Sequence, residues 1–231
     1  SAGSGKTGVL VNRIANLINA YGVKPENILA ITFSKKAKDS IKIRLEKLIP
    51  NQYNSVYIET FHSFGYKICK MFDDTKCRLI TYDWEKQKIL NDIYHIHNKY
   101  EDIENINDLL NYISIRKNNL IRPYKKTEDY QKEQIYEEYE IYKQKNNIMD
   151  FDDMLTRSYD ILNINKDALN YCREQFKFIL VDEIQDINKV QYEIIKKIAL
   201  KYKNLFLVGD MMQNIFEWRG SSNDFITNFK K

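Results

Sequence analysis

The first third of the chain alternates amphipathic stretches with short apolar runs. Apolar residues at helical spacing predict a helix that ends near Tyr21 and two further helices over 35–48 and 64–72. Between these stretches lie two apolar runs, 28–33 and 56–59, which predict buried strands. Strands that alternate with helices are typical of a parallel sheet covered by helices. The pattern therefore predicts an α/β fold.

The middle of the chain, about 83–147, changes character. It is rich in Lys, Glu, Tyr, Asn and Ile, and its apolar residues recur at helical spacing, for example at Ile135, Tyr139 and Tyr142. Such Tyr and Ile side chains are more typical of packing than of ligand contact. We expect a helical insertion without strands, with helices over 83–98, 108–117 and 127–145.

The α/β pattern resumes at Asp150. A helix is predicted over 151–162, followed by two apolar strands, 178–181 and 205–208, which both lead into acidic residues. Ligands of open α/β sheets bind at the carboxyl ends of the strands, so these acidic ends are candidates for one shared site. The sequence thus predicts an α/β domain in two parts, 1–80 and 150–231, with the insertion at 81–149.

Composition changes this picture little. The 231 residues include 7 Gly and 3 Pro and are 43% hydrophobic, which excludes collagen-like and disordered classes. The net charge of +4 permits a polyanionic partner without demanding one. Three cysteines without CxxC spacing indicate neither a disulfide framework nor a zinc site, and they fit a cytoplasmic location. No apolar run is long enough to span a membrane, so we expect no membrane partner.

A glycine-rich phosphate-binding pattern opens the chain. Residues 1–7 match the Walker A pattern except for its first glycine, which would precede Ser1. In such a loop backbone N–H groups hold phosphate oxygens, Lys6 reaches the outer phosphates and the Thr7 hydroxyl binds Mg²⁺. A merely flexible Gly/Ser start is disfavoured because an apolar-periodic helix follows at once. Since such a loop normally follows a buried strand, we expect this chain to be a fragment of a longer protein.

Two adjacent carboxylates, Asp182 and Glu183, follow the apolar run 178–181, as in a Walker B strand. Asp182 would hold Mg²⁺, usually through water, while Glu183 would orient and deprotonate the water that attacks the γ-phosphate. Alone, this pattern could be a solvated turn. In a chain that also carries a Walker A loop, we interpret it as part of a nucleotide site on which both strand ends converge.

The strand over 205–208 leads into a segment with a neutral amide and two aromatic rings. Gln213 could hydrogen-bond a γ-phosphate and sense its loss. Phe216 and Trp218 alternate, so they could present two rings to one face, and bases stack on such rings at about 1–3 kcal/mol each. Without the other motifs, an aromatic pair near a strand is more typical of core packing.

Taken in order, these segments resemble the motifs of the UvrD/Rep family of superfamily 1 DNA helicases. The resemblance covers the whole chain, and six ordered matches are far more specific than any one of them. They are motif I at 1–7, motif Ia at 28–37, motif Ib at 59–63, an MDFDDLL-like stretch at 150–154, motif II at 181–186 and motif III at 208–220.

This resemblance implies a RecA-like P-loop NTPase domain, the family's domain 1A. Its parallel sheet, with helices on both faces, is interrupted by an all-helical insertion, domain 1B. It also implies an ATP- and Mg²⁺-dependent enzyme that moves 3′ to 5′ along single-stranded DNA and separates partly duplex DNA. A second RecA-like domain is expected downstream of Lys231, and without it we expect little hydrolysis by the isolated chain.

Position by position, the resemblance also assigns site residues. The catalytic set is Lys6, Asp182, Glu183 and Gln213, and the metal set is Thr7 and Asp182. The ATP-binding set is Ser1, Ala2, Gly3, Ser4, Gly5, Lys6, Thr7, Gln213 and Arg219. The DNA-binding set is Phe33, Lys36, Thr60, His62, Phe216 and Trp218.

Some positions depart from the family pattern. Met211 and Met212 stand where the family often has aspartates, Lys35 where asparagine is common, and Glu217 where glycine is usual. These changes affect the geometry near DNA and leave the catalytic pattern intact. Two alternatives stay open: the motor portion of a RecB-like or AddA-like helicase-nuclease, and a non-catalytic remnant that binds single-stranded DNA.

Overall fold

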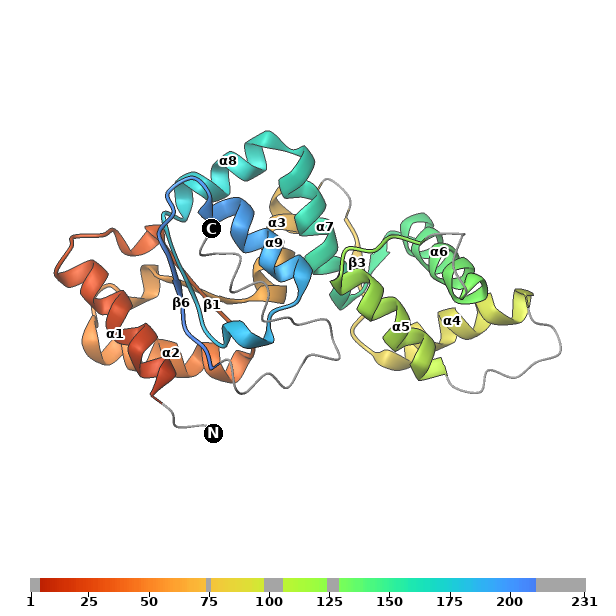
Figure 1. Ribbon diagram of the computed structural model, residues 1–231, viewed down its shortest axis with the longest axis horizontal. Helices are drawn as coiled ribbons and strands as arrows, with labels where there is room; N and C mark the ends of the chain where they lie inside the picture. The colour runs from red at the N-terminus through yellow and green to blue at the C-terminus, as the bar shows by residue number, and fades with distance from the viewer. Residues whose placement is uncertain (1–4, 74–75, 98–105, 124–128, 211–231) are drawn as a thin grey trace.

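A four-stranded parallel sheet forms the centre of the fold. The computed structural model describes residues 5–73, 76–97, 106–123 and 129–210, and its main sheet has the strand order β2-β1-β5-β6 (Figure 1). All pairs are parallel and in such a register that the four carboxyl ends lie at one end of the sheet. The strands are β1 (Ile28–Thr32), β2 (Tyr57–Thr60), β5 (Phe178–Val181) and β6 (Leu205–Leu207).

Helices cover both faces of this sheet, which confirms the predicted fold class. Alternate residues of β1 enter two different cores: Ile28 and Ala30 pack with the helices of one face, and Leu29 and Ile31 with those of the other. The first face carries α1 (Lys6–Asn19) and α2 (Lys35–Leu48). The second carries α3 (Phe61–Phe72), α7 (Phe151–Ile164), α8 (Lys166–Gln175) and α9 (Lys189–Ala199).

The helical insertion lies to one side of the sheet and has a core of its own (Figure 1). Ile89, Leu109 and Tyr136 pack together there, one from each of its helices. The helices are α4 (Asp83–His97), α5 (Ile106–Asn118) and α6 (Tyr130–Lys145). The chain leaves and re-enters through two short parallel strands, β3 (Arg78–Leu79) and β4 (Ile148–Met149).

Several elements differ from the sequence prediction. The helices α8 and α9 and the pair β3–β4 were not predicted. The helix expected from residue 64 begins at Phe61, because the Thr60 side chain accepts from the Ser63 N–H and caps it there. The strand expected to end at residue 33 ends at Thr32, because Ser34 already caps α2. Short 3₁₀ turns occur at η1 (Pro25–Asn27), η2 (Tyr53–Ser55) and η3 (Ile184–Asp186).

A buried charge network joins the insertion to α7. The Lys143 ammonium donates to Asp150 at 2.8 Å and to Asp153 at 2.6 Å, and Lys117 donates to Asp150 at 2.9 Å. Both lysines are only 1–2% exposed. Burial alone would raise the pKa of Asp150, but the two ammonium groups hold it well below its ordinary value. These charges tie α5 and α6 to the start of α7.

Candidate nucleotide and nucleic-acid sites

The first candidate site lies at the amino end of α1. Gly5 precedes the helix in the left-handed conformation, with φ of 76°, and among the described residues no side chain caps this end. The first turn also contains no acidic residue. An uncapped helix start presents N–H groups and the positive end of the helix dipole, which together suit an anion.

Residues far apart in sequence meet beside this helix start. The Lys6 ammonium donates to Glu183 Oε2 at 2.6 Å, and the Thr7 hydroxyl donates to Asp182 Oδ2 at 3.4 Å. The end of β5 supplies both carboxylates, and Asp182 is only 2% exposed. Burial and the neighbouring Glu183 charge raise the pKa of Asp182. The structure thus brings the described parts of motifs I and II together.

Glu183 is held in an unusual backbone conformation. Its φ of 52° places a non-glycine residue in the left-handed region. The Gln185 amide donates to Glu183 Oε2 at 2.7 Å, and Gln185 Oε1 accepts from the Asp210 N–H at 2.9 Å. A Cβ on Gly209 would lie 2.4 Å from Gln185 Oε1 and 2.6 Å from Ile184 Cγ2, so a larger residue would have to displace both side chains. Gln185 thereby connects the ends of β5 and β6.

Sequence reasoning did not assign Gln185 and Gly209 to the site. Their position within motifs II and III, shortly after two predicted strands, is the sequence feature that could have assigned them to the site. Several predicted site residues lie outside the part of the chain that the structure describes. These are Ser1, Ala2, Gly3, Ser4, Gln213, Phe216, Trp218 and Arg219.

The second candidate site is a cleft of about 630 Å³ between the sheet's carboxyl end and the insertion. Phe33 and His62, both predicted to contact DNA, line it. The Phe33 ring packs edge-on against Phe61, and the His62 ring packs edge-on against Phe151 at 6.2 Å. Hydroxyl and amide groups complete much of the wall, from Ser34, Asn111, Ser114, Asn118, Asn188 and Gln191.

Two further predicted DNA contacts do not line this cleft. The Thr60 hydroxyl accepts from the Ser63 N–H at 3.1 Å and so has a structural role as the cap of α3. Lys36 is exposed in the first turn of α2, where it lines a different surface hollow. Of the DNA set, the structure therefore brings together Phe33 and His62.

A buried hydrogen-bond chain fixes the floor of the cleft. Asn188, which caps α9 just after motif II, donates its side-chain amide to Asn118 Oδ1 at 2.8 Å. Asn118 in turn donates to Asp152 Oδ1 at 3.1 Å. Burial and the Asp150 charge raise the pKa of Asp152. The chain links α5 of the insertion to the segment that follows the nucleotide site, and sequence reasoning missed it.

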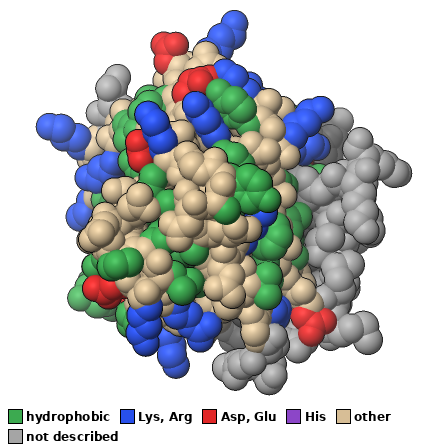
Figure 2. Space-filling model, turned by 90° about the vertical axis from the view of Figure 1, so that its left-hand side faces the viewer, with side chains coloured by type: hydrophobic (Ala, Val, Ile, Leu, Met, Phe, Trp, Pro, Cys, Tyr) green, Lys and Arg blue, Asp and Glu red, His purple; other side chains and the backbone are tan. Residues whose placement is uncertain are grey.

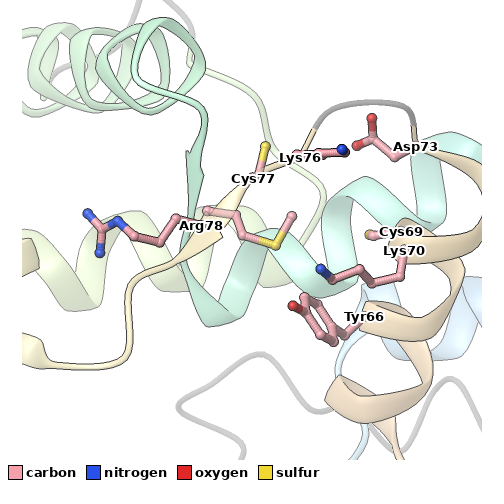
Figure 3. A pocket seen from close by; sticks show the side chains of 8 residues that line it. Tyr66, Cys69, Lys70, Asp73, Lys76, Cys77 and Arg78 are labelled. Atoms are coloured by element: carbon pink, nitrogen blue, oxygen red, sulfur yellow. The ribbon is translucent and has the colours of Figure 1, made fainter.

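A separate hollow lies where α3 meets β3 (Figure 3). Tyr66 and Cys69 reach it from α3, and Cys77 and Arg78 from the segment that leads into the insertion. The Arg157 guanidinium donates to Cys77 Sγ at 2.8 Å. Burial raises the pKa of the Cys69 thiol to about 12, which keeps it protonated and unreactive at neutral pH. We assign no chemistry to this hollow.

Two features are absent from the described residues. Within these ranges, no three or more His, Cys, Asp or Glu side chains are grouped to hold a metal ion. No helix in the same part of the chain has the length and apolar character needed to cross a membrane.

Comparison with known proteins points to one family. The model of the UvrD/REP helicase N-terminal domain matches residues 1–231. A probable DNA helicase II homolog of Mycoplasma genitalium is 40% identical, over 99% of this chain and 35% of its own length. The ATP-dependent DNA helicase PcrA of Staphylococcus aureus is 34% identical, over 100% of this chain and 33% of its own length. This chain spans about a third of the length of these relatives. It belongs to the UvrD/REP helicase family.

Proposed function

We propose that this chain is the ATP-binding and DNA-contacting first motor portion of an ATP-dependent DNA helicase. One observation carries the proposal: Lys6 and Thr7, at the start of α1, meet Glu183 and Asp182, at the end of β5. A phosphate-binding helix start beside two carboxylates is the arrangement that phosphoryl transfer to water needs. The relative named ATP-dependent DNA helicase supports ATP as the nucleotide.

Lys6 is positioned to exchange partners when nucleotide binds. Its ammonium lies 2.6 Å from Glu183 Oε2, and a γ-phosphate at the start of α1 would compete for the same charge. Once Lys6 turns to the phosphate, Glu183 keeps its hydrogen bond from Gln185 but loses its ion pair with Lys6. Its carboxylate can then accept a proton. Glu183 would then act as the general base toward the attacking water.

The donor set fits Mg²⁺. The Thr7 hydroxyl and the Asp182 carboxylate offer two oxygens 3.4 Å apart, and Mg²⁺ prefers oxygen ligands. We propose that these two side chains hold the ion, directly or through water. When bound, Mg²⁺ neutralises charge that develops on the phosphates. The cation would also favour the ionised form of Asp182 against the effect of its burial.

Single-stranded DNA is the proposed occupant of the cleft. The Phe33 and His62 rings offer surfaces for bases, and the amides of the wall offer hydrogen bonds. Among the described residues, the charged ones of the lining are Lys86, Asp152 and Asp186, so the strand's phosphates are expected to lie on the Lys86 side. Lys36 and Thr60 remain proposed contacts, as do Phe216 and Trp218 outside the described residues. Action on partly duplex DNA, movement 3′ to 5′ and a second RecA-like domain that completes the ATP site are further parts of this proposal.

The same proposal divides the chain at 80/81 and 149/150. The insertion helices pack around their own core, which supports treating 81–149 as a unit. The β3–β4 pair closes this unit at its base, because it joins the two segments that connect it to the motor.

ATP hydrolysis with and without single-stranded DNA tests the proposed function. The assay compares this chain alone with a protein in which the chain is followed by its second RecA-like domain, each with a Lys6→Ala control. We expect DNA-stimulated, Lys6-dependent turnover in the longer protein. We expect turnover by the chain alone to be about 10³- to 10⁵-fold lower, since arginines from a partner domain supply rate factors of this size. Absence of turnover in both proteins would favour the non-catalytic, DNA-binding alternative.

A further inference from the structure

The helix α2 concentrates the positive charge of the chain. Its 14 residues include six Lys or Arg but only two acidic residues, Asp39 and Glu46, an excess of four positive charges. The whole chain has the same excess, 36 basic against 32 acidic residues, so the remainder is neutral in sum. A charge excess confined to one helix marks a surface for a negatively charged partner.

The basic residues form a stripe along the outer face of α2. Ile41 and Leu45 bury the opposite face in the core, while Lys36, Arg44 and Lys47 are exposed. These three residues line one continuous hollow of about 640 Å³. Figure 2 views the end of the molecule that carries α1 and α2, and it shows Lys and Arg side chains along the lower edge as well as at the top and left of this face.

The protein neutralises the stripe only in part, because Asp39 is, among the described residues, the one acidic residue that lines the same hollow. Lys38, on another face of α2, forms an ion pair with Glu59 at 2.7 Å. Within the described ranges, Lys36, Arg44 and Lys47 form no ion pair. Arg44 also comes within 3.9 Å of the position that a Cβ on Gly8 would take, so it reaches over the first turn of α1. Of the three unpaired charges, that of Arg44 therefore lies next to the start of α1.

The stripe continues the proposed DNA cleft. Ser34 caps α2 and lines the cleft together with Phe33, while Lys36 follows two residues later on the stripe. From Lys36 to Lys47 a helix advances by about 16 Å, which is enough to follow several phosphates of one strand. The two surfaces thus meet at the amino end of α2.

We infer that the outer face of α2, through Arg44 and Lys47, binds the sugar-phosphate backbone of a nucleic-acid strand that extends beyond the cleft. This inference rests on the proposed function, because it takes the cleft as the start of the strand's path. Exposed cations along one helix face suit phosphates, which carry no sequence information. An acidic protein surface fits less well, because Ile43 is the only large apolar residue in the hollow and protein interfaces depend on buried aromatic anchors.

The test compares two double variants with the same change in net charge. Arg44→Ser with Lys47→Ser removes two of the three cations of the stripe. Lys24→Ser with Lys166→Ser removes two exposed lysines elsewhere, before β1 and at the start of α8. Affinity for oligothymidylate of about 30 nucleotides, long enough to exceed one binding site, is measured over a range of salt concentrations. Circular dichroism confirms that both variants fold.

We expect the stripe variant to bind the oligonucleotide more weakly. The negative slope of log affinity against log salt should become less steep by about 1.4, because each lost contact with a single-strand phosphate contributes about 0.7. The control variant should keep the wild-type slope. Equal slopes in all three proteins would overturn the inference and leave the proposed function standing. No binding by the wild type would contradict both, and a selective loss of polyglutamate binding would assign the stripe to an acidic protein.

Discussion

Glu183 has two partners and a strained backbone in this structure. Lys6 and Gln185 both donate to the same oxygen, Oε2. A non-glycine residue in the left-handed region costs on the order of 1–3 kcal/mol, and such strain is characteristic of functional sites. The conformation places the Glu183 carboxylate next to the start of α1, where a nucleotide phosphate is proposed to bind.

Replacement of Glu183 by glutamine tests its role at the scale of one side chain. Glu183→Gln keeps the size of the side chain but removes the base, so we expect turnover to fall by about 10²- to 10⁴-fold. Nucleotide affinity should be retained or slightly increased, because Lys6 no longer has a carboxylate partner. Steady-state ATPase rates and equilibrium nucleotide binding are measured on the longer protein. Unchanged turnover would show that Glu183 is not the base.

Among the elements, α5, α6 and α7 depend on buried charges. Lys143→Met leaves Asp150 and Asp153 with one ammonium fewer in a buried site. We expect a loss of about 3–5 kcal/mol in the free energy of unfolding, because the removal of one partner strands the other charge. Lys145→Met, two residues along α6 and exposed, is the matched control and should change stability little. Urea unfolding measures both, and equal stabilities would contradict a structural role for the network.

The same network predicts a dependence on pH. The pKa of Asp150 lies well below its ordinary value of 3.8, because the two lysines outweigh the effect of burial. An aspartate with a lowered pKa stabilises the fold above that ordinary value, and this contribution is lost as pH falls through the folded-state pKa. In Lys143→Met, protonation of Asp150 relieves the stranded charge. The difference in free energy of unfolding between wild type and variant should therefore narrow below about pH 4. A difference that stays constant with pH would argue against a role of the Asp150 charge in this network.

The packing of α3 on α7 requires a glycine. A Cβ on Gly65 would lie 2.5 Å from the Met154 carbonyl oxygen, which is backbone and cannot rotate away. We expect Gly65→Ala to lower the free energy of unfolding by about 1–3 kcal/mol through overpacking. Gly8→Ala in α1 is the comparison, since its Cβ would meet nothing closer than 3.9 Å. If thermal unfolding shows both variants to be as stable as the wild type, α3 and α7 can move apart at Gly65 without loss of stability.

Elements with a local signal could be predicted, and elements that depend on distant partners could not. The apolar runs that became β1 and β5 are visible in the sequence, and both are almost wholly buried. The strands β3 and β4 have two residues each and exist only through their pairing. In α8 only Ala168 and Cys172 are buried, which is too few to show periodicity. By contrast α9 has a clear apolar period after Asn188, so the signal was present and was not used.

Site residues follow the same division. The pairing of Lys6 with Glu183 could be expected from motifs I and II, because parallel strands place their carboxyl ends together. The burial of Lys117 and Lys143 could not be expected from the sequence, since lysine on an amphipathic helix normally faces water. The bond from Asn188 to Asn118 joins segments 70 residues apart and has no local signature.

At the scale of the whole molecule, the cleft joins the sheet's carboxyl end to the insertion. Phe33 lines it from the end of β1, so Phe33→Ala should weaken single-stranded DNA binding by about 1–3 kcal/mol. Nucleotide affinity should stay unchanged. Tyr21→Ala is the control, because this exposed aromatic lies just after the carboxyl end of α1 and does not line the cleft. Fluorescence anisotropy with a labelled oligonucleotide measures both, and equal affinities would remove Phe33 from the proposed DNA path.

If motifs I and II form one nucleotide site in this chain, nucleotide binding should depend both on Mg²⁺ and on Lys6. Calorimetry with a non-hydrolysable ATP analogue compares the wild type with Lys6→Ala, with and without Mg²⁺. We predict binding that weakens about 10- to 100-fold in Lys6→Ala, the loss expected for a charge-assisted hydrogen bond, and that also weakens when Mg²⁺ is removed. Equal affinity of the two proteins, with or without the metal, would contradict the account.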